Sequence, residues 1–125
     1  MKVGYARSLK CAELLDVQVN YLQQANCTRI FQSENKNDAP EVIAKMFDFI
    51  RDGEDTIVIH ELLTLNLSVK QMMQFMQRLE TKGLGLEVIK QNIKINKDQW
   101  SIAYKALRLY EWLENQYKLE NQLGE

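Results

Sequence analysis

Thr56-Ile57-Val58-Ile59 is an uninterrupted run of β-branched residues, and it decides how the rest of the chain is interpreted. A half-exposed strand alternates apolar and polar side chains, and this run does not. It is typical of a strand buried on both faces, as in a parallel sheet covered by helices. The run therefore predicts an α/β fold built around a central parallel sheet.

The sequence on both sides of this run alternates between strand and helix patterns. Short β-type runs occupy residues 2–7, 28–31 and 86–89. Apolar residues recur at helical spacing within residues 14–26, 40–52, 68–82 and from about Asp98 onward. The resulting order, β-α-β-α-β-α-β-α, predicts a three-layer α/β/α domain with a mostly parallel sheet of four or five strands.

Several residues are suited to mark the helix ends. Asp38 is a candidate N-cap just before Pro40, and proline suits the first turn of a helix. Ser68 is a candidate N-cap of the next helix, and Gly83 is a natural C-terminal cap. The polar segment 32–38 is a loop by composition. In sheets of this class ligands bind beyond the carboxyl ends of the strands, so chemistry is expected at residues 7–10, 32–39, 60–68 and 90–97.

The last helix differs in kind from the others. Its apolar and aromatic residues cover too wide an arc for one packing face, which predicts that its outer side packs on a partner chain. The alternative is an ordinary core helix whose aromatic rings lie flat on the surface. We therefore divide the chain into an α/β domain, residues 1–97, and a dimerisation helix, residues 98–125. The residues expected at the dimer interface are Trp100, Tyr104, Leu107, Trp112 and Leu113.

Composition limits the classes of function. The chain has 125 residues, enough for one domain, and a net charge of −1, whereas a protein that binds DNA unaided usually carries a basic excess. Cys11, Cys27 and His60 match no metal motif, so neither a metal nor a cofactor is expected. No signal-peptide or transmembrane run is present, and we expect a cytoplasmic protein.

The opening strand, Met1-Lys2-Val3-Gly4-Tyr5-Ala6-Arg7, resembles that of the serine site-specific recombinases, the resolvase and DNA-invertase family. In that family a strand ends in a Tyr-Ala-Arg-Val-Ser type motif. Weaker matches follow in the same order along nearly the whole chain. They comprise Asp16-Val17-Gln18 with Leu22, Ala25-Asn26-Cys27 with Ile30-Phe31, residues 53–59, Ser68 with the Met-rich helix, Lys82-Gly83, and residues 86–89.

The resemblance implies a chemistry that needs a serine and several arginines. A serine hydroxyl would attack a DNA phosphodiester, and arginines would stabilise the charge on the non-bridging oxygens. Arg7 matches the opening arginine, and Gln18 matches a structural glutamine. The nucleophile's position falls on Leu9, and the arginine of an Arg-Pro pair falls on Ala39. The family's Asp-Arg-Leu-Gly-Arg motif falls on Leu63-Thr64-Leu65-Asn66-Leu67.

Ser8 and the pair His60-Glu61 are two other candidates for catalytic residues. Ser8 is one residue from the nucleophile's position, and a one-residue slip in an extended segment turns a side chain to the opposite face. It is better explained as a turn or capping serine. His60 and Glu61 could form an acid-base pair, but a strand-end histidine beside a solvated glutamate is the simpler interpretation. Met72, Met73 and Met76 are expected to pack in the core or to form an adaptable interface.

Three hypotheses follow. The first is a catalytically inactive relative of the serine recombinases that pairs with itself or with an active recombinase. The second is an active recombinase with a rearranged site. The third is an unrelated nucleotide-binding or small-molecule-binding α/β domain, although Arg7-Ser8-Leu9-Lys10 contains no glycine for a phosphate loop. In the family a helix-turn-helix domain normally follows the last helix, and we expect it to be absent here. The sequence identifies neither a biological partner nor a DNA site.

Overall fold

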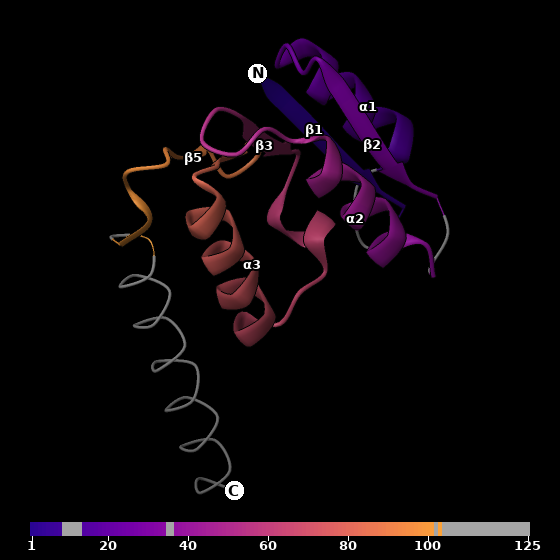
Figure 1. Ribbon diagram of the computed structural model, residues 1–125. Helices are drawn as coiled ribbons and strands as arrows, with labels where there is room; N and C mark the ends of the chain where they lie inside the picture. The colour runs from indigo at the N-terminus through magenta and orange to yellow at the C-terminus, as the bar shows by residue number, and fades with distance from the viewer. Residues whose placement is uncertain (9–13, 35–36, 102, 104–125) are drawn as a thin grey trace, which may run out of the picture.

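A five-stranded sheet forms the centre of the molecule (Figure 1). The computed structural model describes residues 1–8, 14–34, 37–101 and 103. The strands lie in the order β2-β1-β3-β4-β5, and only β5 runs antiparallel to its neighbour. The strands are β1 (Lys2–Arg7), β2 (Arg29–Ser33), β3 (Thr56–Ile59), β4 (Gly85–Val88) and β5 (Ile93–Ile95).

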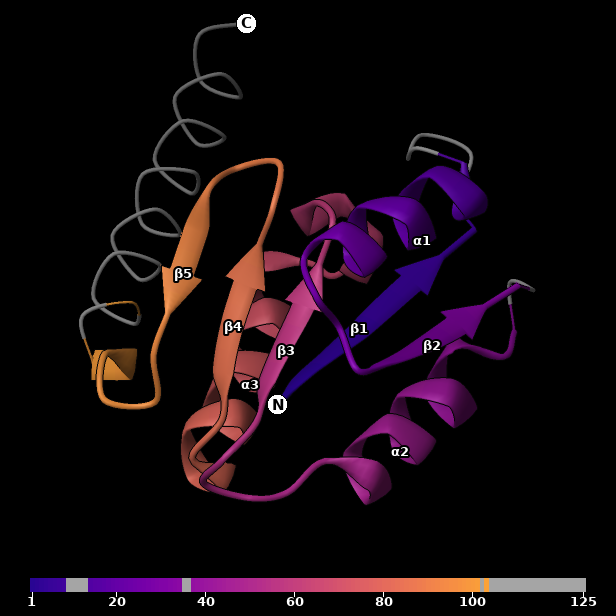
Figure 2. The same ribbon diagram turned by 90° about the horizontal axis from the view of Figure 1, so that it is seen from above.

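Helices cover both faces of this sheet. The helix α1 (Leu15–Gln24) lies on one face, and α2 (Ala39–Phe49) and α3 (Val69–Lys82) lie on the other (Figures 1 and 2). A short 3-10 helix, η1 (Leu62–Leu65), follows β3. The arrangement confirms the predicted three-layer fold with a mostly parallel sheet. Among the described residues, no helix is long and apolar enough to cross a membrane.

The two faces of the sheet bury different residues, as the pleat of a strand requires. Val3, Tyr5, Ile57 and Ile59 belong to the larger cluster, which includes residues of α2 and α3. Ala6 and Val58 pack with Leu22 on the α1 side. The strand β3 contributes to both clusters, so its continuous apolar run reflects burial on both faces of the sheet, as predicted.

Gly4 lies on the α1 side of β1, and α1 approaches the strand closely there. A Cβ atom at Gly4 would stand 3.1 Å from Leu22 Cδ1 and 3.2 Å from Cys27 Sγ. The absence of a side chain at this position therefore lets α1 pack directly on the opening strand.

Two of the three predicted caps are confirmed. The Ser68 hydroxyl accepts a hydrogen bond from the Gln71 backbone N–H, and the Gln71 side-chain Oε1 accepts one from the Ser68 backbone N–H, forming a capping box. Gly83 closes α3 in the left-handed conformation, with φ +67°. Asp38 precedes α2 but makes no side-chain cap, because its carboxylate accepts from the Glu34 N–H.

The structure also corrects several predicted boundaries. The helix α2 ends at Phe49, before the expected Asp52-Gly53, and β2 continues to Ser33 instead of ending at Phe31. Residues 93–95, placed in a loop, form the antiparallel edge strand β5. Its pattern, Ile-Lys-Ile, is too short to be distinguished from a loop by periodicity.

Trp100 is a core residue of its own chain, so its predicted place at a dimer interface is wrong. Its side chain is 1% exposed, and its Nε1 donates to the Leu84 carbonyl oxygen at 2.7 Å. A buried indole N–H needs such a partner, and the backbone before β4 supplies it. The other expected interface residues lie outside the described residues, as does most of the predicted helix. They are Tyr104, Leu107, Trp112 and Leu113.

Candidate functional site

Arg7 ends β1 at the carboxyl edge of the sheet, and a buried glutamine holds its backbone. The Gln18 Oε1 accepts from the Arg7 N–H at 3.1 Å, and its Nε2 donates to the Arg7 carbonyl oxygen at 2.8 Å. Gln18 is fully buried on α1. The amide side chain thus hydrogen-bonds both backbone groups of Arg7 and sets the position of this residue.

The Arg7 side chain lines a cavity of about 550 Å³, here called the Arg7 cavity. Its Nη1 makes a long, 3.5 Å hydrogen bond to the Leu65 carbonyl oxygen, and its Nε is buried with no partner among the described residues. The described residues therefore satisfy the guanidinium only in part. The cavity is lined by Arg7, Asn37, Ala39, Pro40, Ile43, Ala44, Leu65, Leu67 and Arg78.

Two of the positions aligned with the family's arginines lie beside Arg7. Ala39, at the start of α2, and Leu67, after η1, both line the Arg7 cavity. Thr64 is completely buried and its Oγ1 has no hydrogen-bond partner among the described residues, whereas Leu63 is 42% exposed. Ala39 and Leu67, two positions at which the resemblance implies arginines, thus line the same cavity as Arg7, and their side chains there are apolar. Leu9 lies outside the described residues.

No hydroxyl group lines the Arg7 cavity among the described residues. Ser8 is exposed, and its backbone N–H donates to the Ser33 carbonyl oxygen at 3.0 Å. Ser33 is fully buried, and its hydroxyl is 2.8 Å from the Tyr5 hydroxyl. Burial raises the pKa of Tyr5, and the Ser33 hydrogen bond and Arg7 only partly offset this, so Tyr5 is a neutral phenol at pH 7.

His60 and Glu61 lie at the end of β3 but do not line the Arg7 cavity. His60 is 4% exposed and stacks on Tyr21, with 4.4 Å between ring centroids. Glu61 is also buried and pairs with Lys90 at 3.2 Å, which corrects the expectation of a solvated glutamate. The two side chains therefore have different partners and do not act as a pair on the cavity.

Arg78, which is not identified as a site residue from the sequence, reaches the same cavity from α3. It is exposed at the rim, with its Cζ 3.7 Å from the centroid of the Phe47 ring. That contact is a cation-π interaction between α3 and α2. No local pattern marks Arg78, because the approach of these two helices is a tertiary contact.

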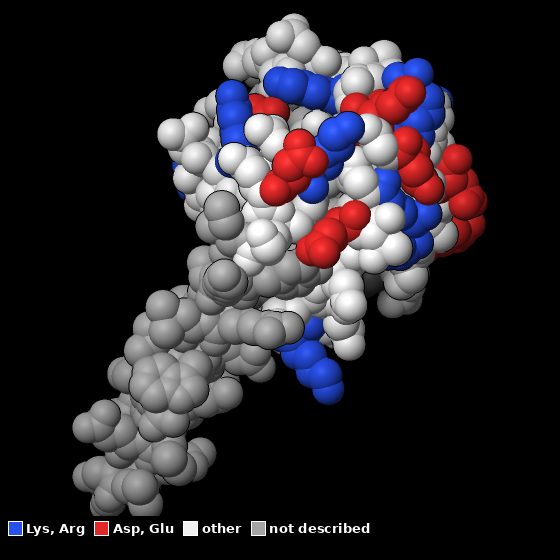
Figure 3. Space-filling view, turned by 60° about the vertical axis from the view of Figure 1, so that its left-hand side comes forward, with Lys and Arg blue, Asp and Glu red and all other residues white. Residues whose placement is uncertain are grey.

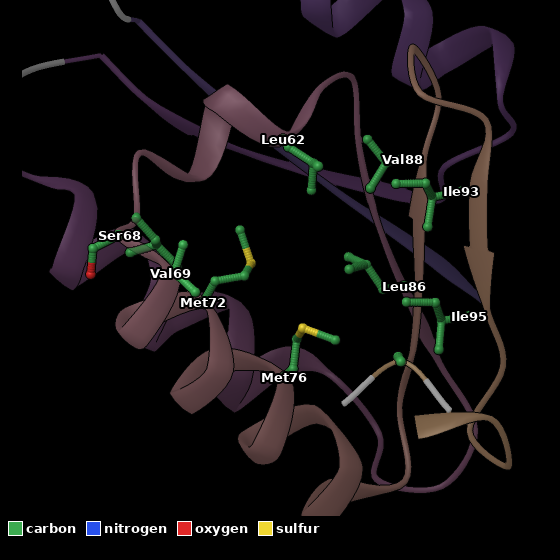
Figure 4. Close-up of a pocket in the computed structure, with 11 residues that line it drawn as sticks. Leu62, Ser68, Val69, Met72, Met76, Leu86, Val88, Ile93 and Ile95 are labelled. Carbon is green, nitrogen blue, oxygen red and sulfur yellow. The ribbon is translucent and has the colours of Figure 1, made fainter. Parts of the chain in front are cut away.

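A second hollow, here called the apolar groove, runs between α3 and the β4–β5 hairpin and has a volume of about 560 Å³. Met72 and Met76 extend from α3 toward Leu86 and Ile95 on the strands (Figure 4). Leu67 lines both the groove and the Arg7 cavity. The lining of the groove comprises Leu62, Leu67, Ser68, Val69, Met72, Met76, Leu86, Val88, Ile93, Ile95 and Ala103.

The described part of the chain shows no cluster of metal ligands. No group of three His, Cys, Asp or Glu side chains there could hold a metal ion. Burial raises the pKa of Cys27 to about 11, so Cys27 is a protonated thiol at neutral pH. On the face drawn in Figure 3, Lys and Arg side chains are interspersed with Asp and Glu.

The chain is similar to known proteins over most of its length. The family described as Resolvase, N terminal domain matches residues 2–123. The chain is 30% identical over 100 residues to the Transposon Tn552 DNA-invertase BinR of Staphylococcus aureus, covering 78% of this chain and 51% of that protein. It is 30% identical over 94 residues to a resolvase of Clostridium perfringens, covering 72% and 49%. The chain thus spans about half the length of these curated relatives.

Two solved structures share the fold. The N-terminal catalytic domain of TP901-1 integrase superposes with a TM-score of 0.66 at 16% identity, over 94% of this chain and 98% of that one. A resolvase family site-specific recombinase from Streptococcus pneumoniae gives a TM-score of 0.61 at 14% identity, over 100% and 99%. At these identities the likeness concerns the fold.

Proposed function

The chain belongs to the serine recombinase family through its resolvase N-terminal domain, and from this premise we propose that it is a catalytically inactive member. It acts by associating with a second copy of itself or with an active recombinase. Family membership removes the alternative of an unrelated nucleotide-binding domain. A cytoplasmic location is part of the same proposal.

The observation that carries the proposal is the apolar wall around Arg7. Phosphoryl transfer needs a nucleophile and several positive charges on the oxygens of the transition state. In the Arg7 cavity the positions aligned with two such arginines are Ala39 and Leu67, and Ser8 is not among the lining residues. A phosphodiester placed there would meet Arg7 and the exposed Arg78, but apolar side chains at the two positions where the resemblance implies arginines.

The apolar groove supports the second half of the proposal. Exposed apolar hollows of this kind are typical of surfaces that bind other proteins, and methionines adapt to different partners. Ala103 lines the groove, so the segment at the start of residues 98–125 passes beside it. We assign residues 98–125 to a dimerisation helix and residues 1–97 to the α/β domain, with Tyr104, Leu107, Trp112 and Leu113 as contacts to the partner.

Incubation with supercoiled DNA tests the loss of catalysis. We expect neither relaxed DNA nor a covalent protein-DNA adduct on a denaturing gel. An adduct that Ser8→Ala abolishes would overturn the proposal in favour of an active enzyme with a rearranged site. An adduct that survives Ser8→Ala would overturn it as well and would point to another nucleophile.

Sedimentation velocity at micromolar concentration tests association. We expect a dimer, and we expect Met72→Lys to weaken it, because a charge in the apolar groove has to be desolvated on binding. Gln74→Lys, on the exposed side of the same helix, is the matched control and should leave the sedimentation coefficient unchanged. A monomer that also fails to bind an active recombinase of the family would contradict the proposal.

A further inference from the structure

We propose that the Arg7 cavity binds a small organic anion, with its phosphate or carboxylate group between Arg7 and Arg78 and its apolar body against the cavity wall. This inference does not depend on the association proposed above. The proposed ligand site uses Arg78, which is not among the positions that the resemblance assigns to the family's catalytic site.

The two arginines both bring positive charge to one cavity. No Asp or Glu is among the described residues that line it, and neither arginine forms an ion pair with a described residue. Arg7 also has a buried Nε without a partner. Cavities lined by one sign of charge, with walls of low dielectric, concentrate ions of the opposite sign.

Both arginines are anchored before any ligand arrives. The Gln18 side chain holds the backbone of Arg7 through two hydrogen bonds. The Arg78 guanidinium lies 3.7 Å from the ring centroid of Phe47, which is 5% exposed. The Phe47 contact restricts the Arg78 side chain, so Arg78 loses less conformational entropy when it binds an anion, which favours affinity.

The rest of the wall fits an apolar body. Besides the two arginines, the cavity is lined by Ile43, Leu65 and Leu67, together with Ala39 and Ala44. A volume of about 550 Å³ is in the range of small-molecule sites, which are mostly apolar with a few placed polar groups. Ala39 and Leu67 stand where the resemblance predicts arginines, so the substitutions that remove phosphate-stabilising charge also create this wall.

A DNA backbone is a poorer match for this cavity than a small anion. Binding a duplex depends on neutralising many phosphates, and the chain has a net charge of −1. A single phosphate on an aromatic or aliphatic body uses both features of the cavity, its two charges and its apolar wall. DNA therefore serves as the competing ligand in the test.

Calorimetric titration of the full chain with phenyl phosphate provides the test. We expect saturable binding at millimolar concentrations or below, and about tenfold or more weaker binding of inorganic phosphate or of phenol, each of which offers half of the ligand. The absence of saturable binding of phenyl phosphate would overturn the inference. Displacement of phenyl phosphate by a short DNA duplex would overturn it too, because the cavity would then be a DNA-phosphate site.

Two variants separate this site from nonspecific binding. Arg78→Gln should weaken phenyl phosphate about tenfold, since one charge-assisted contact is lost. Ala44→Leu should weaken it by filling the cavity without changing any charge. Arg29→Gln is the matched control: Arg29 also stacks on aromatic rings, at 4.9 Å from Phe31 and 5.4 Å from Phe49, but does not line the cavity.

A loss of binding must be distinguished from a loss of folding in each variant. Thermal unfolding followed by circular dichroism identifies a variant that does not fold, and Ala44→Leu then carries the test if Arg78→Gln fails. Unchanged affinity in a folded Arg78→Gln would overturn the inference. Because sedimentation reports association separately, a failure here leaves the proposed dimer standing, and the reverse also holds.

Discussion

The two edges of the sheet differ in how completely their polar groups are satisfied. At the amino edge, before β3, the Asp55 carboxylate accepts from the Arg51 N–H at 2.9 Å and lies 3.3 Å from both the Met1 amino group and Arg51 Nη2. Nearby, Trp100 Nε1 donates to the Leu84 carbonyl oxygen before β4. These contacts close the amino edge with hydrogen bonds and ion pairs.

At the carboxyl edge the situation is reversed. The buried side-chain atoms that lack a partner within the described ranges all lie there: Arg7 Nε at the end of β1, His60 Nδ1 after β3, and Thr64 Oγ1 in η1. Each such atom costs about 1–3 kcal/mol of stability. Within the described residues, the unpaired groups are thus concentrated at the edge where parallel sheets bind their ligands. The contrast indicates that the amino edge stabilises the fold, whereas the carboxyl edge carries the candidate site.

The largest effect is expected at the amino edge, from Trp100→Ala. Removing a buried tryptophan leaves a cavity and an unpaired carbonyl, so the free energy of unfolding should fall by about 4 kcal/mol. Urea denaturation measures it. Leu14→Ala is the control, because Leu14 is 72% exposed and should change stability by less than about 0.5 kcal/mol. A loss as small as that of the control would contradict a core position for Trp100 and would favour the dimer-interface position that the sequence predicts.

Asp55→Asn should have the next largest effect. The substitution keeps the shape of the side chain but removes the charge that faces Met1 and Arg51, and we expect a loss of about 2 kcal/mol. Glu54→Gln removes the neighbouring ion pair with Arg51, in which both side chains are exposed, and should cost less than about 0.5 kcal/mol. Equal effects of the two substitutions would show that the amino edge is not specially stabilised.

The pH dependence of stability should reflect the same carboxylate. Burial raises the pKa of Asp55, but the Arg51 backbone N–H, the Met1 amino group and the Arg51 guanidinium outweigh it, so the pKa lies below its ordinary value of 3.8. A lowered pKa in the folded state stabilises the protein above 3.8 and loses that contribution as the pH falls through the folded pKa. The stability difference between the native chain and Asp55→Asn should therefore be constant near neutral pH and shrink in acid. A difference that grows in acid would contradict the assignment.

Part of the fold follows from local sequence. The β-branched run of β3, Ser68 as the N-cap of α3 and Gly83 as its C-terminal cap are all local signals, and each prediction is confirmed. Trp100 is the exception, because an aromatic helix residue has the same local pattern whether it packs on its own sheet or on a partner. Only its contact with Leu84, 16 residues away, distinguishes the two.

The site was predicted in part. A collinear match along the chain identifies Arg7, Ala39 and Leu67 as neighbours, and the three line one cavity. Arg78 could not be identified in the same way, because its place depends on how α3 packs against α2. Short edge strands such as β5 and tertiary contacts between helices leave no periodic signal in the sequence.

Thr64→Val addresses the carboxyl edge and is expected to have the smallest effect, in the opposite direction. The Thr64 side chain is fully buried and its hydroxyl has no partner among the described residues, so valine keeps the shape and removes a desolvated polar atom. Stability should rise by about 1 kcal/mol in urea denaturation, while Thr81→Val, at an exposed position of α3, should change it little. A stabilised variant would mean that the carboxyl edge holds a polar group at the expense of stability. A destabilised variant would mean that the Thr64 hydroxyl is satisfied in solution, and the contrast between the two edges would then rest on Arg7 and His60 alone.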